Sequence, residues 1–86
     1  MKITREKLEQ IFEETESNWE GDNAFKGLQI LSQYTDNLIQ GAEHDIIYSI
    51  SIDEIIELGI TDDHCYQLRL LNWMVDSDCD CLACFV

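Results

Sequence analysis

Three pairs of an isoleucine followed by a hydroxyl residue divide this chain into segments. They are Ile3-Thr4, Ile50-Ser51 and Ile60-Thr61. In each pair the Ser or Thr is a suitable N-cap for a helix, and the isoleucine can pack on the residue five positions later as a hydrophobic staple. The pairs therefore predict helices that begin after Thr4, Ser51 and Thr61. Gly59 is placed to end the second of these helices in a left-handed conformation.

The first helix is predicted to be amphipathic and acidic on its wet side. Its apolar residues at helical spacing are Leu8, Ile11, Phe12 and Trp19. Glutamates recur at steps of three and four beside that face, which places them in one stripe along the same helix. The stripe consists of Glu6, Glu9, Glu13, Glu16 and Glu20. The helix is therefore expected to extend to residue 20.

A second helix is predicted after a Gly-Asp-Asn turn. Phe25, Leu28 and Leu31 have the three-residue spacing of a buried face. Gly27 is expected to weaken this helix slightly, because glycine has a low helix propensity. The stretch from residue 35 to 41 loses the helical period and predicts a connecting loop.

Runs of strand length occupy residues 45–50, 73–75 and 81–86. β-Branched and aromatic residues dominate the first run. The other two runs flank a polar turn at 76–80, so the chain is expected to finish as a β-hairpin. The order of elements predicts one α+β domain over residues 1–86, with two N-terminal helices and two short helices on one face of a three-stranded, mostly antiparallel sheet.

Charge is the strongest sequence clue to function. The chain has 18 acidic and 5 basic residues and a formal net charge of −13. The sequence after Lys26 contains eleven acidic residues and a single basic residue, Arg69. Such a field repels phosphate and anionic lipid, so neither nucleic acid nor a membrane is expected as a direct partner. Like charges at helical i,i+4 spacing cost about a few tenths of a kcal/mol per pair, which favours a functional acidic surface over a merely solvated one. The alternative, that the acids serve only solubility, stays open.

We predict that the acidic surface binds a basic nucleic-acid-binding protein or complex. Besides the glutamate stripe, the predicted surface includes the acids in the later segments of the chain. These are Asp53, Glu54, Glu57, Asp62, Asp63, Asp76, Asp78 and Asp80. No cofactor is expected. The last strand could pair with the same strand of a second copy and form a homodimer.

In size, one-signed charge and its glutamate series, the chain resembles the small acidic inhibitors made by phages and other mobile elements. This group includes anti-CRISPR, anti-restriction and DNA-mimic proteins. The resemblance covers the whole chain and concerns its size and charge rather than a motif. It implies a protein that occupies the basic nucleic-acid channel of a host defence or DNA-processing enzyme.

Four cysteines lie in the last quarter of the chain, Cys65, Cys79, Cys81 and Cys84. Since the chain begins without the apolar region of an export signal, we expect a cytoplasmic protein with reduced thiols. Together with His64 the cysteines could offer zinc ligands, but the C-x-C-x-x-C run lacks the second pair of a common zinc knuckle. In an extended strand Cys79 and Cys81 would share one face, and Cys84 would point to the opposite face. We expect small core residues here and keep a zinc-binding module as an alternative.

No pattern in the chain favours catalysis. His44 and His64 each lie beside an aspartate, but no nucleophile elbow, zinc-protease helix or phosphate loop accompanies them. Acidic surroundings would raise the thiol pKa of Cys65 and disfavour it as a nucleophile. The D-x-D-x-D run at residues 76–80 lacks the later glycine and glutamate of a calcium loop. The chain is expected to be a binding protein, the second alternative being a regulatory module that binds through an apolar patch or a sheet edge.

Overall fold

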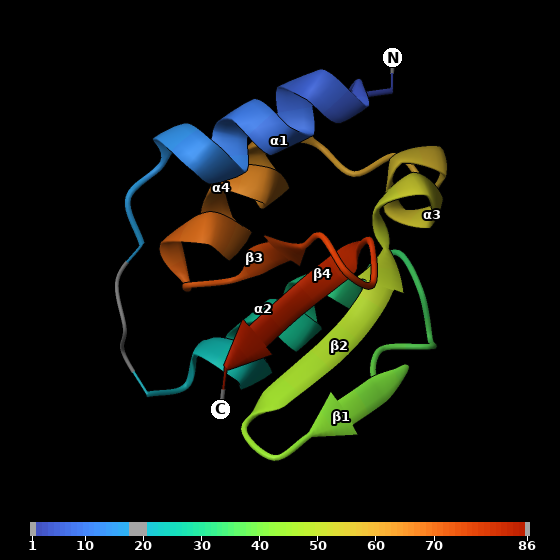
Figure 1. Ribbon diagram of the computed structural model, residues 1–86. Coiled ribbons are helices and arrows are strands. Elements are labelled where there is room, and N and C mark those ends of the chain that lie inside the picture. Colours follow the sequence, from blue (N-terminus) through green and yellow to red (C-terminus); the bar gives the residue numbers. More distant parts are fainter. Residues whose placement is uncertain (1, 18–20, 86) are drawn as a thin grey trace.

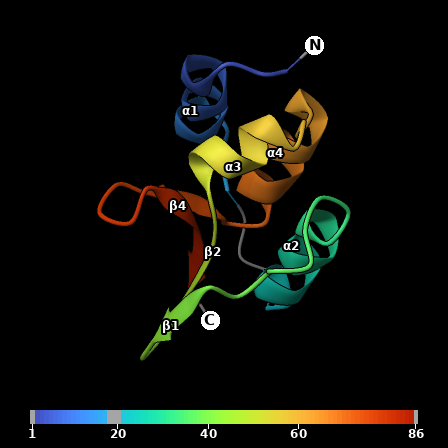
Figure 2. The same cartoon turned by 90° about the vertical axis from the view of Figure 1, so that its right-hand side faces the viewer.

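The computed structural model describes residues 2–17 and 21–85 of the chain. Along these residues the elements are α1 (Arg5–Glu14), α2 (Asn23–Leu31), β1 (Gly41–Glu43), β2 (Ile46–Ser51), α3 (Ile52–Glu57), α4 (Asp62–Leu70), β3 (Met74–Asp76) and β4 (Cys81–Phe85). The strands form one antiparallel sheet in the order β1-β2-β4-β3 (Figure 1). Figure 2 shows α2 and α4 on one side of β2 and β4, and α1 packs against α4. The predicted α+β class is confirmed, and β1 is a fourth strand that was not predicted and begins at the end of the loop predicted at 35–41.

The three predicted helix starts are confirmed. The side chains of Thr4, Ser51 and Thr61 each accept a hydrogen bond from the backbone N–H three residues later, at 3.1 to 3.2 Å. Gly59 ends α3 with a φ of +90°, as predicted. Asn72 ends α4 in the same region, with a φ of 67°. Local capping chemistry therefore sets the bounds of most helices.

The first helix is shorter than predicted. It ends one residue before Thr15, whose backbone is extended at φ −88° and ψ 129°. The carbonyl of Thr15 accepts a hydrogen bond from Nε of Arg69 at 3.2 Å, and the polar run that begins there has low helix propensity. Glu16 therefore lies beyond the helix. The predicted positions of Trp19 and Glu20 fall outside the described residues.

The second helix keeps part of its predicted core face, since Leu31 is buried and Leu28 packs against the core, but it is rotated so that Phe25 lies outside. Asn23, Gly27 and Leu31 are its buried residues, whereas Phe25 is 63% exposed. The indole of Trp73 lies against Gly27, and its Nε1 donates to the carbonyl of Asn23 at 3.0 Å. The prediction that Phe25 is a core residue is wrong because a large ring from a distant segment needs the glycine face of the helix.

The last strand occupies the interior of the sheet. It pairs with β2 on one side and β3 on the other, so it offers no edge to a second copy, and the predicted exposed last strand is wrong. The edges are β1 and β3, each three residues long. Leu82 and Cys84 of β4 join Leu68 and Trp73 in the main hydrophobic core. α2 and α4 thus lie on one face of a narrow sheet whose centre is formed by β2 and β4.

Candidate acidic binding surface

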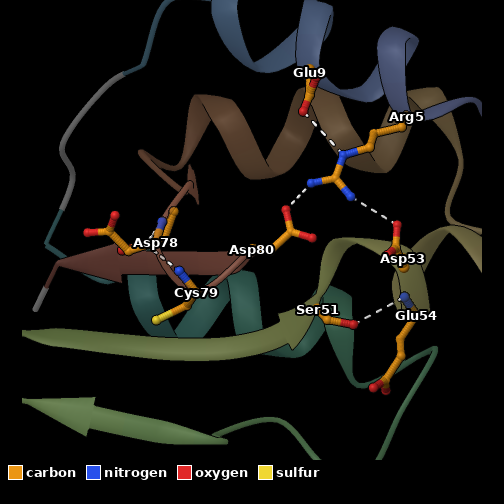
Figure 3. A network of polar contacts seen from close by, with 9 residues as sticks. Arg5, Glu9, Ser51, Asp53, Glu54, Asp78, Cys79 and Asp80 are labelled. Atoms are coloured by element: carbon orange, nitrogen blue, oxygen red, sulfur yellow. Dashed lines mark hydrogen bonds and ion pairs between the residues drawn. The ribbon is translucent and has the colours of Figure 1, made fainter.

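Arg5 brings together acids from three separate parts of the chain (Figure 3). Its guanidinium pairs with Glu9 of α1 at 3.3 Å, with Asp53 of α3 at 2.9 Å, and with Asp80 in the turn before β4. One positive charge therefore faces three carboxylates, and the group keeps a negative net charge. We call these four residues the Arg5 cluster. The sequence predicted the acids as binding residues, but it did not predict that a base holds them together.

Local structure places each carboxylate of the Arg5 cluster. Glu9 lies one turn after Arg5 on α1, and Asp53 lies in the first turn of α3. Asp80 has a φ of 55°, a left-handed conformation that Asp adopts more readily than most residues. Its carbonyl accepts a hydrogen bond from the backbone N–H of Ile52 at 3.0 Å. Asp80 is therefore connected to α1 through its side chain and to α3 through its main chain.

A second ion pair lies along the same junction of α1 and α3. Nζ of Lys2, just before α1, is 2.8 Å from the carboxylate of Glu57 at the end of α3. This hydrogen bond, reinforced by the charge of Lys2, lowers the pKa of Glu57. Both side chains are well exposed, so water and salt screen the pair.

Five further acids of the predicted surface are exposed. Glu6 and Glu13 are exposed on α1, and Glu16 is exposed after the end of that helix. Glu54 and Asp78 are exposed, and Figure 3 shows their carboxylates directed away from Arg5. These carboxylates face water rather than the Arg5 cluster.

The other predicted acids are placed differently. Asp62 and Asp63 are exposed in the first turn of α4, where Asp63 accepts a hydrogen bond from Gln67 at 2.8 Å. Asp76 turns its carboxylate into its own loop, where Oδ1 accepts from the backbone N–H groups two and three residues later, at 2.9 and 3.0 Å. Asp76 thus stabilises the hairpin turn, as Asp commonly does.

Three bases connect separate parts of the fold through their side chains. Two of them are Lys2 and Arg5, described above. The third is Arg69, whose guanidinium donates to the carbonyls of Thr15 and Trp73 at 3.2 and 3.1 Å. These bases therefore stabilise the fold, while most of the carboxylates face water.

An apolar pair is exposed on α4. Tyr66 and Leu70 lie one turn apart and are 42% and 51% exposed. Asp62 lies one turn before Tyr66 on the same side of the helix. This pair was not predicted from the sequence, although its position opposite the buried Cys65 and Leu68 could have indicated it.

The cysteines are free thiols, three of them buried and Cys79 exposed. Burial raises the pKa of Cys65 to about 12, with a smaller contribution from Asp62, and burial raises that of Cys84 to about 11. His64 is held by the hydroxyl of Tyr34 through Nδ1, with the two rings edge to face. Within the described parts of the chain, no three His, Cys, Asp or Glu side chains gather where they could hold a metal ion. The zinc alternative gains no support from this arrangement.

A scan against protein-family models, a search of curated proteins and a search of solved structures each gave no match. Among the helices of residues 2–17 and 21–85, none combines the length and apolar character needed to cross a bilayer.

Proposed function

We propose that this protein is a small acidic inhibitor that occupies the basic nucleic-acid-binding surface of a host defence or DNA-processing complex. The arrangement of charge carries this proposal. Lys2, Arg5 and Arg69 make internal contacts, whereas exposed carboxylates gather on α1, α3 and the turn before β4. A protein that normally binds phosphate through Lys and Arg would meet carboxylates there instead.

The mechanism is electrostatic competition with nucleic acid. Glu6 and Glu13 lie seven residues apart on α1, a distance of about 10 Å along the helix axis. Phosphates of one DNA strand follow each other at about 3.4 Å along the duplex axis, so this separation spans about three phosphate steps. The carboxylates would pair with Lys and Arg side chains of the partner. Association would be fast at low salt, and affinity would fall as salt screens the charges.

Two charge-matched variants test the proposal. The first neutralises three exposed acids of the proposed surface, by Glu6→Gln, Glu13→Gln and Asp78→Asn. The control neutralises three exposed acids before and within the β1–β2 hairpin, by Asp36→Asn, Glu43→Gln and Asp45→Asn. Both variants lose the same amount of negative charge, and Figure 1 shows β1 far from α1. A difference between them reports the position of the acids and not the net charge.

The measurement is a pull-down with tagged protein from nuclease-treated host-like lysate, at low and high salt, followed by mass spectrometry. We expect a nucleic-acid-binding protein that is retained at low salt and displaced by added DNA or RNA. The first variant should lose this partner and the control should keep it. Retention that is insensitive to salt, or equal for the two variants, would contradict the proposal.

A second candidate function is a regulatory module that binds through an apolar patch. The exposed Tyr66 and Leu70 on α4 favour it, because tyrosine is enriched among the residues that carry binding energy at interfaces and the pair leaves apolar surface exposed. For this function, Tyr66→Ser with Leu70→Ser should abolish binding, and the Glu6, Glu13 and Asp78 variant should retain it. The same pull-down therefore separates the two functions.

A further inference from the structure

We propose that Cys79 and Cys81 are a modification site that forms a reversible disulfide by exchange with a small-molecule disulfide. The two thiols belong to the hairpin formed by β3 and β4, and both line one surface cavity of about 240 Å³. Tyr48 and Ser51 of β2 line the same cavity. The two cysteines lie in the turn that also carries Asp78 and Asp80 of the acidic surface. The proposal concerns the thiols and does not depend on the proposed function.

The backbone between the two cysteines favours their approach. In an extended strand, Cα atoms two residues apart are separated by about 6.6 to 7.2 Å. A disulfide usually needs a Cα separation of about 5.5 to 6 Å. Asp80, the residue between the cysteines, has a left-handed φ of 55°, which coils the chain and shortens that separation. The turn is held in place because Asp76 accepts a hydrogen bond from the backbone N–H of Cys79 at 3.0 Å.

The two thiols differ in their exposure to solvent, so each acts in a different step of the exchange reaction. Cys79 is exposed and Cys81 is buried. Burial, followed by the neighbouring Cys79 thiol, raises the pKa of Cys81 to about 11. The accessible Cys79 is therefore the thiol that meets a reagent from solution, and Cys81 is the thiol that resolves the product.

The reaction consists of two thiol–disulfide exchanges. The thiolate of Cys79 attacks one sulfur of the small disulfide, which breaks its S–S bond, releases one small thiolate and leaves a mixed disulfide on Cys79. Cys81 loses its proton to water, and its thiolate attacks the sulfur of Cys79 and releases the second small thiolate. The two released thiolates take up the two protons that Cys79 and Cys81 gave to water. The protein dithiol is oxidised by two electrons, and the small disulfide is reduced to two thiols.

Oxidation would act on the Arg5 cluster through Asp80. The new ring encloses Asp80, whose carboxylate pairs with Arg5 and whose carbonyl accepts the N–H of Ile52 at 3.0 Å. Because ring closure changes the backbone angles of Asp80, both contacts should weaken. The disulfide would thereby loosen the hairpin turn from α1 and α3.

The test uses cystamine, a cationic disulfide that the net charge of −13 attracts, whereas anionic glutathione disulfide would be repelled. Intact mass spectrometry should show wild-type protein losing two hydrogen atoms. Cleavage on the N-terminal side of Asp80 should then give fragments that stay joined until dithiothreitol is added. Cys81→Ser should stop at the mixed disulfide with one cysteamine, Cys79→Ser should form no intramolecular disulfide, and the control Cys84→Ala should behave as wild type. A wild-type protein that stops at the mixed disulfide, or whose fragments separate without reductant, would overturn the proposal.

Amide hydrogen exchange tests the effect on the fold. On oxidation, the amide of Ile52 should exchange roughly tenfold faster, and reduction should restore its protection. An unchanged rate at Ile52 in protein carrying the mapped disulfide would refute the proposed link to α3.

Discussion

Replacing Gly27 with alanine tests the packing that orients α2. A Cβ at this position would lie 1.9 Å from Nε1 and 2.3 Å from Cε2 of Trp73, far inside normal contact distance. Trp73 is completely buried, so its ring cannot move out into water. Either the indole or the whole helix has to shift. The glycine is therefore required by tertiary packing, although the sequence alone predicted it only as a weak point of the helix.

Three effects determine the size of the loss. Overpacking a core costs about 1 to 3 kcal/mol. A shifted indole would also lose its hydrogen bond to the carbonyl of Asn23, and a buried polar group left unpaired costs about 1 to 3 kcal/mol more. The better helix propensity of alanine returns at most about 1 kcal/mol. We expect the free energy of unfolding to fall by about 2 to 4 kcal/mol, out of the about 4 to 13 kcal/mol typical of a chain of this length.

Urea unfolding at equilibrium measures this loss, and the melting temperature should fall by about 10 to 25 °C. Gly41→Ala is a matched control, because its new Cβ would meet Tyr48 at an ordinary 3.7 Å. The control should change stability by less than about 0.5 kcal/mol. A double-mutant cycle adds Trp73→Phe, whose smaller ring should reduce the cost of Gly27→Ala. If Gly27→Ala is as stable as wild type, Trp73 does not pack on this face of α2 and the reasoning fails.

The remaining predictions concern charge, backbone conformation and the thiols. Arg5→Gln should lower the free energy of unfolding by about 1 kcal/mol at low salt and by less at high salt, because its pairs are partly exposed; a loss independent of salt in urea unfolding would contradict this. Asn72→Ala should cost about 1 kcal/mol while Asn72→Gly stays near wild type, since α4 ends there at a φ of 67°; equal stability of the two variants would show that this end is not left-handed. Burial raises the pKa of Cys65 from 9.0 to about 12, so the unfolded thiol ionises first and stability should decline as pH rises between those values. Denaturant unfolding across that pH range should show a shallower decline for Cys65→Ala, and identical slopes would count against a buried thiol.

Elements that depend on neighbouring residues could be predicted from the sequence. The caps at Thr4, Ser51 and Thr61 act within one turn of backbone, and the structure confirms all three. Elements that depend on distant residues could not be predicted. The rotation of α2 is set by Trp73, which lies about fifty residues away in the chain. The strand at 41–43 has three residues, none of them β-branched or aromatic, and it forms because β2 offers it a hydrogen-bonding edge.

The candidate surface, too, could be predicted from the sequence only in part. Counting charges predicted an acidic surface, because net charge depends on composition. The Arg5 cluster could not be predicted, since it needs α1, α3 and the hairpin turn to meet at one guanidinium. The glutamates from Glu6 to Glu20 were also expected to form one continuous stripe on a long helix, but α1 ends at Glu14, before Glu16.

The internal ion pairs decide which acids can report on binding. A Lys or Arg of a partner would have to compete with Arg5 for Asp53, so neutralising Asp53 would lower stability and binding together. Such a variant could not separate a binding role from a structural one. Glu6, Glu13 and Asp78 are exposed and lie outside the Arg5 cluster, so their neutralisation should leave stability within about 0.5 kcal/mol of wild type. If these three substitutions weaken capture of a basic partner while urea unfolding stays unchanged, the acidic surface acts in recognition; if they change neither, the acids serve solubility and the fold.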